Sequence, residues 1–373
     1  MSKPISGKKI FKALCDEPTI ILACNTRVTK GTVKGILRAA KDTDSPVIIE
    51  LAKSECNLDV GYTGYTPETF SKAVKKIAKE VGHDIWALHA DHITIKKGTD
   101  QEIEETKKLI KSQIESGFTS FAIDASHLFN TNADNEKEQL KENIRVTTEL
   151  AKYIEKEIKS KEFGLEVEVG EVGKKDDQGM VITTPKEALT FITELINNGI
   201  DPDVLAIANG SSHGNIYDQA GNLIEQVSID IARTKEIVDV LRQKGFCVRI
   251  AQHGITGTPI DLIYKKFPHG DIIKGNVGTY WQNIYFDVLK VHNPQLYDKI
   301  WKWVINKYKG SGKTELEIFG KRAKYAHKEF FEEIYAMDKD MEKNLELMAY
   351  SHALLFLKAF KSHGYAAHVR KIL

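Results

Sequence analysis

The stretch Ala87-Leu-His-Ala-Asp-His92 ends an apolar run with a histidine, and two later stretches repeat this arrangement. They are Ala208-Asn-Gly-Ser-Ser-His-Gly214, which carries His213, and Ile250-Ala-Gln-His-Gly254, which carries His253. The three histidines lie far apart in the sequence, so only a fold can bring them together. A parallel β/α barrel does so, because all of its strands open onto one catalytic face.

Short apolar runs rich in β-branched residues alternate with helical patterns along the chain. Runs that are apolar on both faces are typical of parallel strands covered by helices. Eight such β/α units favour a closed barrel over a doubly wound sheet, and no GxGxxG motif supports a dinucleotide fold. The predicted strands are Thr19–Cys24, Pro46–Leu51, Asp84–Leu88, Ser120–Ile123, Leu165–Val169, Val204–Ala208, Cys247–Ala251 and Asp271–Lys274.

Two predicted helices between the strands begin with a Thr-Pro pair, in which threonine is the N-cap and proline the first helical residue. Thr66-Pro67 opens the helix that contains Phe70–Val81, and Thr184-Pro185 opens the helix that contains Ala188–Asn197.

After about residue 290 the pattern becomes helical only. Trp301–Tyr308, Glu315–Asp338 and Met341–Lys361 are predicted to be amphipathic helices. We therefore expect an α/β protein: a (β/α)8 TIM barrel over residues 1–290 and a C-terminal helical extension over 291–373. The extension is expected to pack on the barrel or on a partner subunit.

Composition narrows the class of protein. The formal net charge is +1, which predicts no long-range attraction to nucleic acid or to a membrane. The four cysteines show no CxxC pairing, and Cys24 and Cys247 are predicted to be buried thiols, which fits a reducing compartment. The first residues lack the apolar core of a signal peptide, and no apolar run is long enough to span a membrane. A cytoplasmic protein is expected.

Polar side chains follow nearly every predicted strand, as an active-site face requires. A lone histidine is more often structural, but His92, His213 and His253 all follow apolar strands. Three imidazoles with an open fourth position are typical of catalytic Zn²⁺, although Co²⁺, Fe²⁺ or Mn²⁺ can bind such a set. Glu168 is a candidate fourth or alternate ligand; the structural alternative is an ion pair with a barrel lysine such as Lys274.

Asp91 precedes His92 directly. A carboxylate beside a metal-bound substrate suits proton transfer to an oxygen, and its alternative role is to orient a ligand imidazole. The glycine-containing loops Gly210–Gly214, His253–Gly257 and Gly275–Thr279 follow the last three strands. Backbone amides and hydroxyls in such loops can bind a phosphate.

The motifs in this order resemble those of the class II, metal-dependent fructose-bisphosphate aldolase family over about residues 5–290. The resemblance rests on Leu88-His-Ala-Asp-His92, Ala122-Ile-Asp-Ala-Ser-His127, Leu165-Glu-Val-Glu-Val-Gly170, Ser211-Ser-His-Gly214, His253-Gly-Ile-Thr-Gly257 and Ile273-Lys-Gly-Asn-Val-Gly-Thr279.

The resemblance implies a zinc-dependent lyase that cleaves a phosphorylated ketose, with fructose 1,6-bisphosphate as the expected substrate and triose phosphates as products. It also implies a homodimer or higher homo-oligomer and a glycolytic or gluconeogenic role. The implied residues are His92, His213 and His253 for the metal, with Glu168 nearby, Asp124 and Glu166 supporting the metal or a monovalent cation, Asp91 for proton transfer, and Asn25, Ser54, Ser212, Gly214, Gly254, Thr256, Gly257, Asn276 and Thr279 for substrate and phosphate.

In the family, a loop after the fifth strand carries a carboxylate that moves a proton of the dihydroxyacetone phosphate half. The family usually has glutamate there; this chain offers Asp176 and Asp177, and the sequence does not choose between them. Other departures affect the residues around the substrate. A family lysine after the Ser-His-Gly turn is replaced near Tyr217-Asp218, an aspartate is replaced by Gly278, and Ala52 stands where serine is usual.

Three alternatives remain open at this point. Lys274 near the end of the eighth strand could support a Schiff-base mechanism. The same fold and metal could serve tagatose 1,6-bisphosphate cleavage or sugar epimerisation. A non-catalytic accessory barrel is the third, and it is disfavoured because all three histidines are present.

Overall fold

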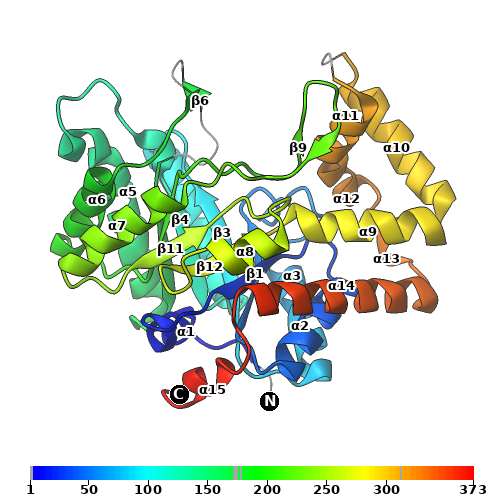
Figure 1. Ribbon diagram of the computed structural model, residues 1–373, viewed down its shortest axis with the longest axis horizontal. Helices are drawn as coiled ribbons and strands as arrows, with labels where there is room; N and C mark the ends of the chain where they lie inside the picture. Colours follow the sequence, from blue (N-terminus) through cyan, green and yellow to red (C-terminus); the bar gives the residue numbers. More distant parts are fainter. Residues whose placement is uncertain (1–2, 171–174, 177–178, 311–312) are drawn as a thin grey trace.

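Eight parallel strands close into a barrel in the computed structural model, and helices cover its outside (Figure 1). The structure describes residues 3–170, 175–176, 179–310 and 313–373. The strand order is β1-β12-β11-β8-β5-β4-β3-β2, and the ring closes because β1 pairs with both β2 and β12. The predicted TIM-barrel fold is confirmed. The barrel strands are β1 (Ile21–Asn25), β2 (Val47–Ala52), β3 (Trp86–Thr94), β4 (Ser120–Asp124), β5 (Gly164–Val169), β8 (Val204–Ile207), β11 (Arg249–Gln252) and β12 (Ile272–Val277).

Each predicted strand coincides with a barrel strand, and the largest difference is at β3. This strand continues to Thr94, well beyond the predicted end at Leu88. Its pairing with β4 shifts register between Ala90 and Ile93. Asp91 and His92 therefore lie within an irregularity of a strand rather than in the loop that follows it.

Two helices between the strands, α3 (Pro67–Val81) and α6 (Pro185–Asn197), begin where the sequence predicts. Thr66 and Thr184 cap α3 and α6, and each forms a reciprocal capping box with the residue three positions later, which satisfies free amides of the first turn. The helices outside the barrel wall are α2 (Thr32–Asp42), α3 (Pro67–Val81), α4 (Asp100–Glu115), α5 (Glu136–Ile158), α6 (Pro185–Asn197), α7 (Ile231–Gln243), α8 (Ile260–Lys266) and α9 (Thr279–His292). Short elements in the loops are η1 (Ser126–Leu128) and two two-stranded sheets, in which β6 (Lys175–Asp176) pairs with β7 (Gly179–Met180) and β9 (Ile216–Tyr217) pairs with β10 (Leu223–Ile224).

The N-terminal helix α1 (Gly7–Leu14) closes the bottom of the barrel (Figure 1). Its Ile10, Phe11 and Leu14 form one apolar cluster with inward-facing strand residues, among them Ile48 and Ile273. The helix approaches the strands closely because it starts with glycine. A Cβ at Gly7 would lie 2.6 Å from the Ser120 Oγ atom.

The C-terminal extension consists of helices, and it packs along one side of the barrel and above it (Figure 1). Its longest helix lies against α2: a Cβ at Gly35 would overlap the backbone of Glu346, and the Tyr350 hydroxyl donates to Asp42 at 3.0 Å. The elements are α10 (Pro294–Tyr308), α11 (Glu315–Arg322), η2 (Ala323–Tyr325), α12 (Ala326–Glu329), α13 (Phe331–Tyr335), α14 (Lys339–Ala359) and α15 (Ala366–Arg370).

The prediction of one continuous helix over Glu315–Asp338 is wrong, because this segment is divided into α11, η2, α12 and α13. Its apolar groups pack against different surfaces. Phe319 stacks on Trp301 of α10, while Tyr325 packs edge-on against Tyr62 of the barrel. A straight helix could not satisfy both contacts, so the chain turns between them.

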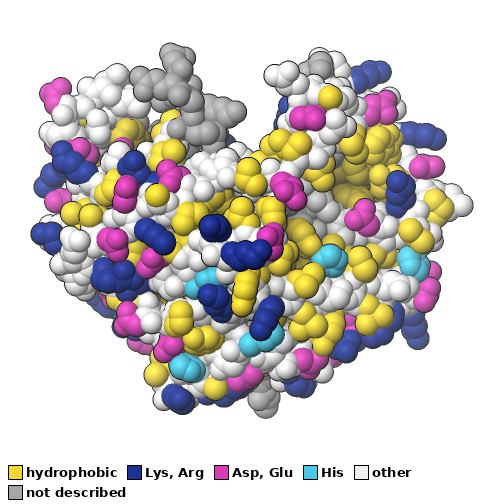
Figure 2. All heavy atoms as spheres, viewed as in Figure 1, with side chains coloured by type: hydrophobic (Ala, Val, Ile, Leu, Met, Phe, Trp, Pro, Cys, Tyr) yellow, Lys and Arg dark blue, Asp and Glu magenta, His cyan; other side chains and the backbone are white. Residues whose placement is uncertain are grey.

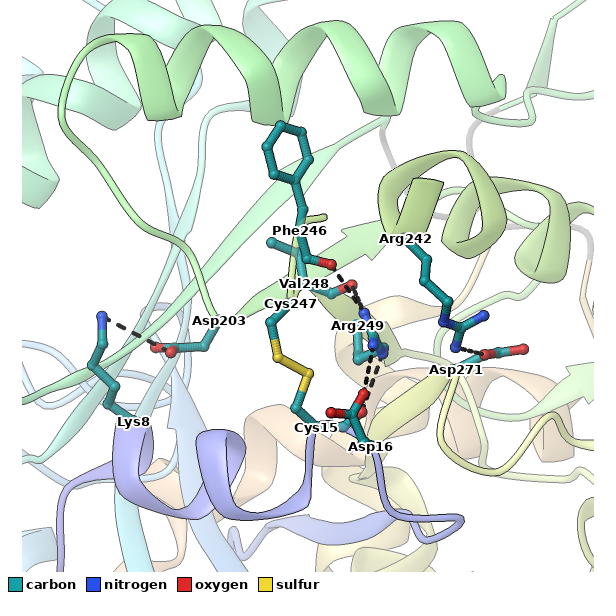
Figure 3. The surroundings of a disulfide bond; sticks show 10 residues. All are labelled: Lys8, Cys15, Asp16, Asp203, Arg242, Phe246, Cys247, Val248, Arg249 and Asp271. Carbon is teal, nitrogen blue, oxygen red and sulfur yellow. Dashed lines mark hydrogen bonds and ion pairs between the residues drawn. A yellow bond between two sulfur atoms is a disulfide. The ribbon is translucent and has the colours of Figure 1, made fainter. Parts of the chain in front are cut away.

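The prediction that Cys247 is a buried thiol is also wrong. Cys247 is exposed and forms a disulfide with Cys15, which follows α1 (Figure 3). The two residues are 232 positions apart, and the barrel brings them together because α1 lies under the start of β11. Cys24 and Cys56 are free and buried. Within the described ranges, no helix has the length and apolar character needed to cross a membrane.

Candidate active site

A cavity of about 630 Å³ opens at the carboxyl ends of the barrel strands. Figure 2 shows this side of the molecule hollowed between the lobe of α10 and α11 and the opposite lobe. Most of the residues predicted for the site line this one cavity. They are Asn25, Ser54, Asp91, His92, Asp124, Glu168, His213, Gly214, His253, Gly254, Thr256, Asn276 and Thr279.

The three predicted metal-ligating histidines converge in this cavity. His92, His213 and His253 each present a ring nitrogen, and these atoms all lie within 4.8 Å of one another. The Nε2 atom of His92 lies 3.1 Å from the Nδ1 atom of His253. Three imidazole nitrogens at this spacing fit the ligand set of a divalent transition metal such as Zn²⁺.

Carboxylates contact the opposite nitrogens of two of these rings. The Nδ1 atom of His92 lies 3.1 Å from Glu168 and 3.7 Å from Asp124, and the Nε2 atom of His253 lies 3.0 Å from Glu166. Such contacts fix the tautomer and orientation of a ligand imidazole. In this arrangement Glu168, Asp124 and Glu166 orient the histidines.

The surroundings shift the pKa values of His92 and His253 in opposite directions. Burial opposes a charge on His92, but Asp91 and Glu168 outweigh it and raise the pKa of this histidine. Burial and the charge of His92 lower the pKa of His253. Burial, followed by the neighbouring Asp124 charge, raises the pKa of Glu168 to about 8. Glu168 is therefore largely protonated at neutral pH, whereas the lowered pKa values of Asp124 and Glu166 keep these two carboxyls ionised.

The backbone at His92 has a positive φ of 38°, which is unfavourable for a residue with a side chain. The strand irregularity between Ala90 and Ile93 enforces this conformation. Backbone strain of this kind persists where the surrounding structure over-determines it, often at a functional site. Here it allows both Asp91 and His92 to line the cavity, although successive strand residues normally point to opposite faces.

Asp91 is held by amides at both of its oxygens. Asn25 donates to Oδ2 at 2.9 Å and Asn276 donates to Oδ1 at 3.3 Å. Burial would raise the pKa of Asp91, but the nearby His92 and Lys274 charges outweigh burial and hold this pKa well below its usual range. The carboxylate is thus ionised, oriented and adjacent to the histidine cluster.

A buried ion-pair cluster lies beneath the cavity. The Lys274 Nζ atom contacts Glu166 at 2.7 Å and Glu50 at 3.0 Å, and the Lys274 side chain is fully buried. Burial opposes the charge on Lys274, but Glu166 and Glu50 outweigh it and raise the pKa of this lysine. The sequence had suggested an ion pair between Lys274 and Glu168 as the structural alternative. In the structure, Lys274 pairs with Glu166 instead.

The glycine-containing loops also meet at the cavity. Gly214, Gly254 and Thr256 line it, and Thr256 Oγ1 accepts a hydrogen bond of 3.2 Å from the Tyr280 amide in the first turn of α9. Gly254 has a φ of 68°, and a Cβ there would lie 2.6 Å from the Ser212 carbonyl oxygen. The close approach of these two loops therefore requires glycine.

Three predicted residues do not line the cavity. Glu166 lies in the cluster below it. The Ser212 amide donates to the Gln226 side chain, and the Gly257 carbonyl accepts from the Gln226 amide. Gln226 therefore links the two loops behind the cavity wall. Asp176 belongs to the short strand β6, and Asp177 lies outside the described residues, so their role as loop base stays a prediction.

Other lining residues were not singled out from the sequence. Arg27, Glu55 and Tyr62 come from the loops after β1 and β2, and Lys324 comes from η2 in the extension. The Arg27 Nε atom donates to Glu55 at 2.7 Å, and the Tyr62 hydroxyl donates to the same carboxylate oxygen at 2.7 Å. Arg27 could have been predicted from the sequence, because it follows the predicted site residue Asn25 by only two positions at the end of β1. Nothing local to Lys324 marks it as part of the site.

The chain is similar in sequence to a known family of metal-dependent aldolases. The family model described as "Fructose-bisphosphate aldolase class-II" matches residues 5–334. A fructose-bisphosphate aldolase of Giardia intestinalis is 28% identical over 62% of this chain, and the match spans 58% of that protein. The Geobacillus stearothermophilus enzyme is 27% identical over 71% of this chain and 78% of its own length.

Solved structures show the same fold. The fructose-bisphosphate aldolase of Campylobacter jejuni has a TM-score of 0.61 at 19% identity and covers 98% of this chain and 97% of its own. The YdjI aldolase of Escherichia coli has a TM-score of 0.60 at 18% identity and covers 97% of this chain and 99% of its own. The family match spans most of the barrel and part of the extension. This chain belongs to the class II fructose-bisphosphate aldolase family, a family of lyases.

Proposed function

We propose that this protein is a zinc-dependent aldolase that reversibly cleaves fructose 1,6-bisphosphate to dihydroxyacetone phosphate and glyceraldehyde 3-phosphate. One observation carries the proposal: three histidines, an ionised aspartate and the glycine-containing loops line a single cavity. The relatives named fructose-bisphosphate aldolase support the choice of substrate.

His92, His213 and His253 would hold the metal, because their nitrogens converge and the outer nitrogens of His92 and His253 contact carboxylates. When bound, Zn²⁺ supplies Lewis acidity that polarises a substrate carbonyl. Side chains would carry out the proton transfers. Asp91, oriented by Asn25 and Asn276, would exchange a proton with the hydroxyl that becomes the aldehyde oxygen. Asp176 or Asp177 would move the proton of the dihydroxyacetone phosphate half.

The Schiff-base alternative is disfavoured by the environment of Lys274. A Schiff base requires a neutral amine with access to the substrate. Lys274 is fully buried, pairs with two carboxylates and has a raised pKa, so it is a charged structural group. Borohydride reduction in the presence of substrate should therefore leave no sugar covalently attached to the protein.

The deciding experiment measures triose phosphate release from fructose 1,6-bisphosphate before EDTA treatment, after it, and after Zn²⁺ is restored. Loss in EDTA and recovery with Zn²⁺ would support the proposal. Metal-independent cleavage would refute the zinc mechanism. If the metal-loaded protein does not cleave fructose 1,6-bisphosphate, the proposed substrate is wrong. Measuring kcat/KM for tagatose 1,6-bisphosphate would then test the nearest alternative. Absence of bound metal after purification and of metal uptake would favour an accessory barrel.

The same proposal includes a homodimer or higher homo-oligomer, as the family resemblance implies. It also includes a cytoplasmic location, which was expected from the sequence because it shows no signal-peptide core and no membrane-spanning run. The Cys15–Cys247 disulfide differs from the reduced cysteines expected for that compartment. Light scattering coupled to size-exclusion chromatography checks the oligomeric state: a monomeric mass at micromolar concentration would contradict it.

A further inference from the structure

The loops that would bind the substrate phosphate provide backbone amides and hydroxyls but little charge. Gly214, Gly254, Thr256 and Thr279 line this part of the cavity, and none carries a cationic side chain. A phosphate ester carries about −1.5 to −2 charges at neutral pH and forms its strongest hydrogen bonds with cationic donors. A cation beside these loops would therefore matter for binding.

Arg27 occupies this position. Its Nη1 atom donates to the Thr279 Oγ1 atom at 3.3 Å, and Thr279 is the first residue of α9. Arg27 lines the same cavity, although only 10% of its side chain is exposed. The positive end of the α9 dipole and a guanidinium thus meet at one wall.

The guanidinium is fixed from two sides. Glu55 accepts from Nε at 2.7 Å, and the Gln282 Oε1 atom accepts from Nη1 at 3.0 Å. Glu55 is itself buried and held by the Ala52 amide at 2.8 Å and by the Tyr62 hydroxyl at 2.7 Å. The five N–H donors of arginine outnumber its hydrogen bonds to Glu55, Thr279 and Gln282, so donor capacity remains for a ligand.

The extension contributes to this arrangement. The Nε2 atom of the buried His327 lies 3.1 Å from the same Gln282 Oε1 atom that accepts from Arg27. Lys324 lines the cavity nearby and lies over the Tyr62 ring at 5.4 Å. Arg27 and Lys324 thus place two cationic side chains beside the carboxylate of Glu55 at this end of the cavity.

We propose that Arg27 binds the substrate phosphate placed beside Thr279, and that it thereby sets the preference for phosphorylated over unphosphorylated ketoses. This inference rests on the proposed function for the identity of the sugar, but it makes a separate claim about phosphate. Glu55 and Gln282 are positioning residues that hold the guanidinium, and His327 connects this group to the extension.

The test compares ligands that differ only in the phosphate. Dihydroxyacetone phosphate and dihydroxyacetone are titrated into the zinc-loaded protein by calorimetry, with inorganic phosphate as a third ligand. Arg27→Gln should weaken binding of dihydroxyacetone phosphate and inorganic phosphate at least about tenfold, as expected for loss of a charge-assisted hydrogen bond. Binding of dihydroxyacetone should stay within about twofold. Arg145→Gln, the same change on the exposed surface of α5, is the matched control.

Arg27→Lys distinguishes a binding defect from a folding defect. It keeps a cation opposite the buried Glu55, so the fold should persist, but it lacks the planar guanidinium that can donate two parallel hydrogen bonds. It should bind phosphate several-fold more weakly and leave circular dichroism and dihydroxyacetone binding unchanged. In kinetics, both variants should raise KM for the phosphorylated substrate more than they lower kcat.

Three outcomes overturn the inference. They are unchanged phosphate binding in both variants, an equal loss for dihydroxyacetone, and the same loss in Arg145→Gln. Failure of the proposed aldol cleavage is a separate result, since the phosphate titrations do not depend on turnover.

Discussion

The Nε2 atom of His92 lies 3.1 Å from the Nδ1 atom of His253, and the other nitrogen of each ring contacts a glutamate. Glu168 contacts His92, and Glu166 contacts His253. The two imidazoles thus lie close together with their outer nitrogens held by carboxylates, as expected of the metal ligands that we propose.

His213→Ala is expected to abolish metal-dependent turnover without unfolding the barrel. His213 lies in an exposed loop after β8, so its loss removes a ligand but little packing. Metal content, triose phosphate release and circular dichroism are measured together, with the exposed His363→Ala as control. Full activity of His213→Ala in metal-free buffer would contradict the ligand assignment.

Asp91→Ala is expected to lower kcat by about 10²–10⁴-fold while metal stays bound, because general acid–base catalysis typically contributes that much. Steady-state kinetics and elemental analysis of the same preparation check this expectation. If the variant loses its metal instead, Asp91 acts by orienting His92 and is not the proton-transfer group.

Asp203→Asn is expected to stabilise the protein at neutral pH. Asp203 lies near Lys8 of α1, and burial raises the pKa of this carboxyl to about 7. The folded protein therefore binds more protons than the unfolded chain between about pH 4 and pH 7, so this group lowers stability as pH rises through that range.

Thermal melts across this pH range test the Asp203 prediction. The Tm of Asp203→Asn relative to wild type should increase from pH 4 to pH 7, because the asparagine never becomes charged. Asp261→Asn, at an exposed residue of α8 that pairs with Lys265, is the control. A Tm difference that does not change with pH would show that Asp203 does not titrate there.

Reduction of the Cys15–Cys247 disulfide is expected to lower the Tm. The bond links residues that are 232 positions apart. In the chain-entropy model, a cross-link that closes a loop of more than 100 residues stabilises the folded protein by roughly 5 kcal/mol, which is an upper bound. The exposed Cys247 allows attack by a soluble thiol. Melts are compared with and without dithiothreitol.

Cys15→Ser provides the control for this measurement, since its Tm should not respond to dithiothreitol. An identical response of the variant and the wild type would mean that the reductant acts elsewhere. Thiol counting under denaturing conditions verifies the bond directly.

Local patterns in the sequence predict much of this protein. Apolar runs with covered faces identify the barrel strands, and Thr-Pro pairs identify the starts of α3 and α6, because strand burial and helix capping depend on neighbouring residues. The three histidines could be placed together because parallel strands of a barrel all end on one face.

Contacts between distant segments decided the rest. Arg27 and Thr279 meet across 252 positions, Cys15 and Cys247 across 232, and Lys324 reaches the cavity from a helix that the sequence predicts to be continuous. None of these contacts leaves a periodic signal, since each depends on how the closed ring and the extension pack. The sequence by itself determined the barrel and the convergence of His92, His213 and His253, whereas only the tertiary structure decided which charged side chains line the cavity beside them.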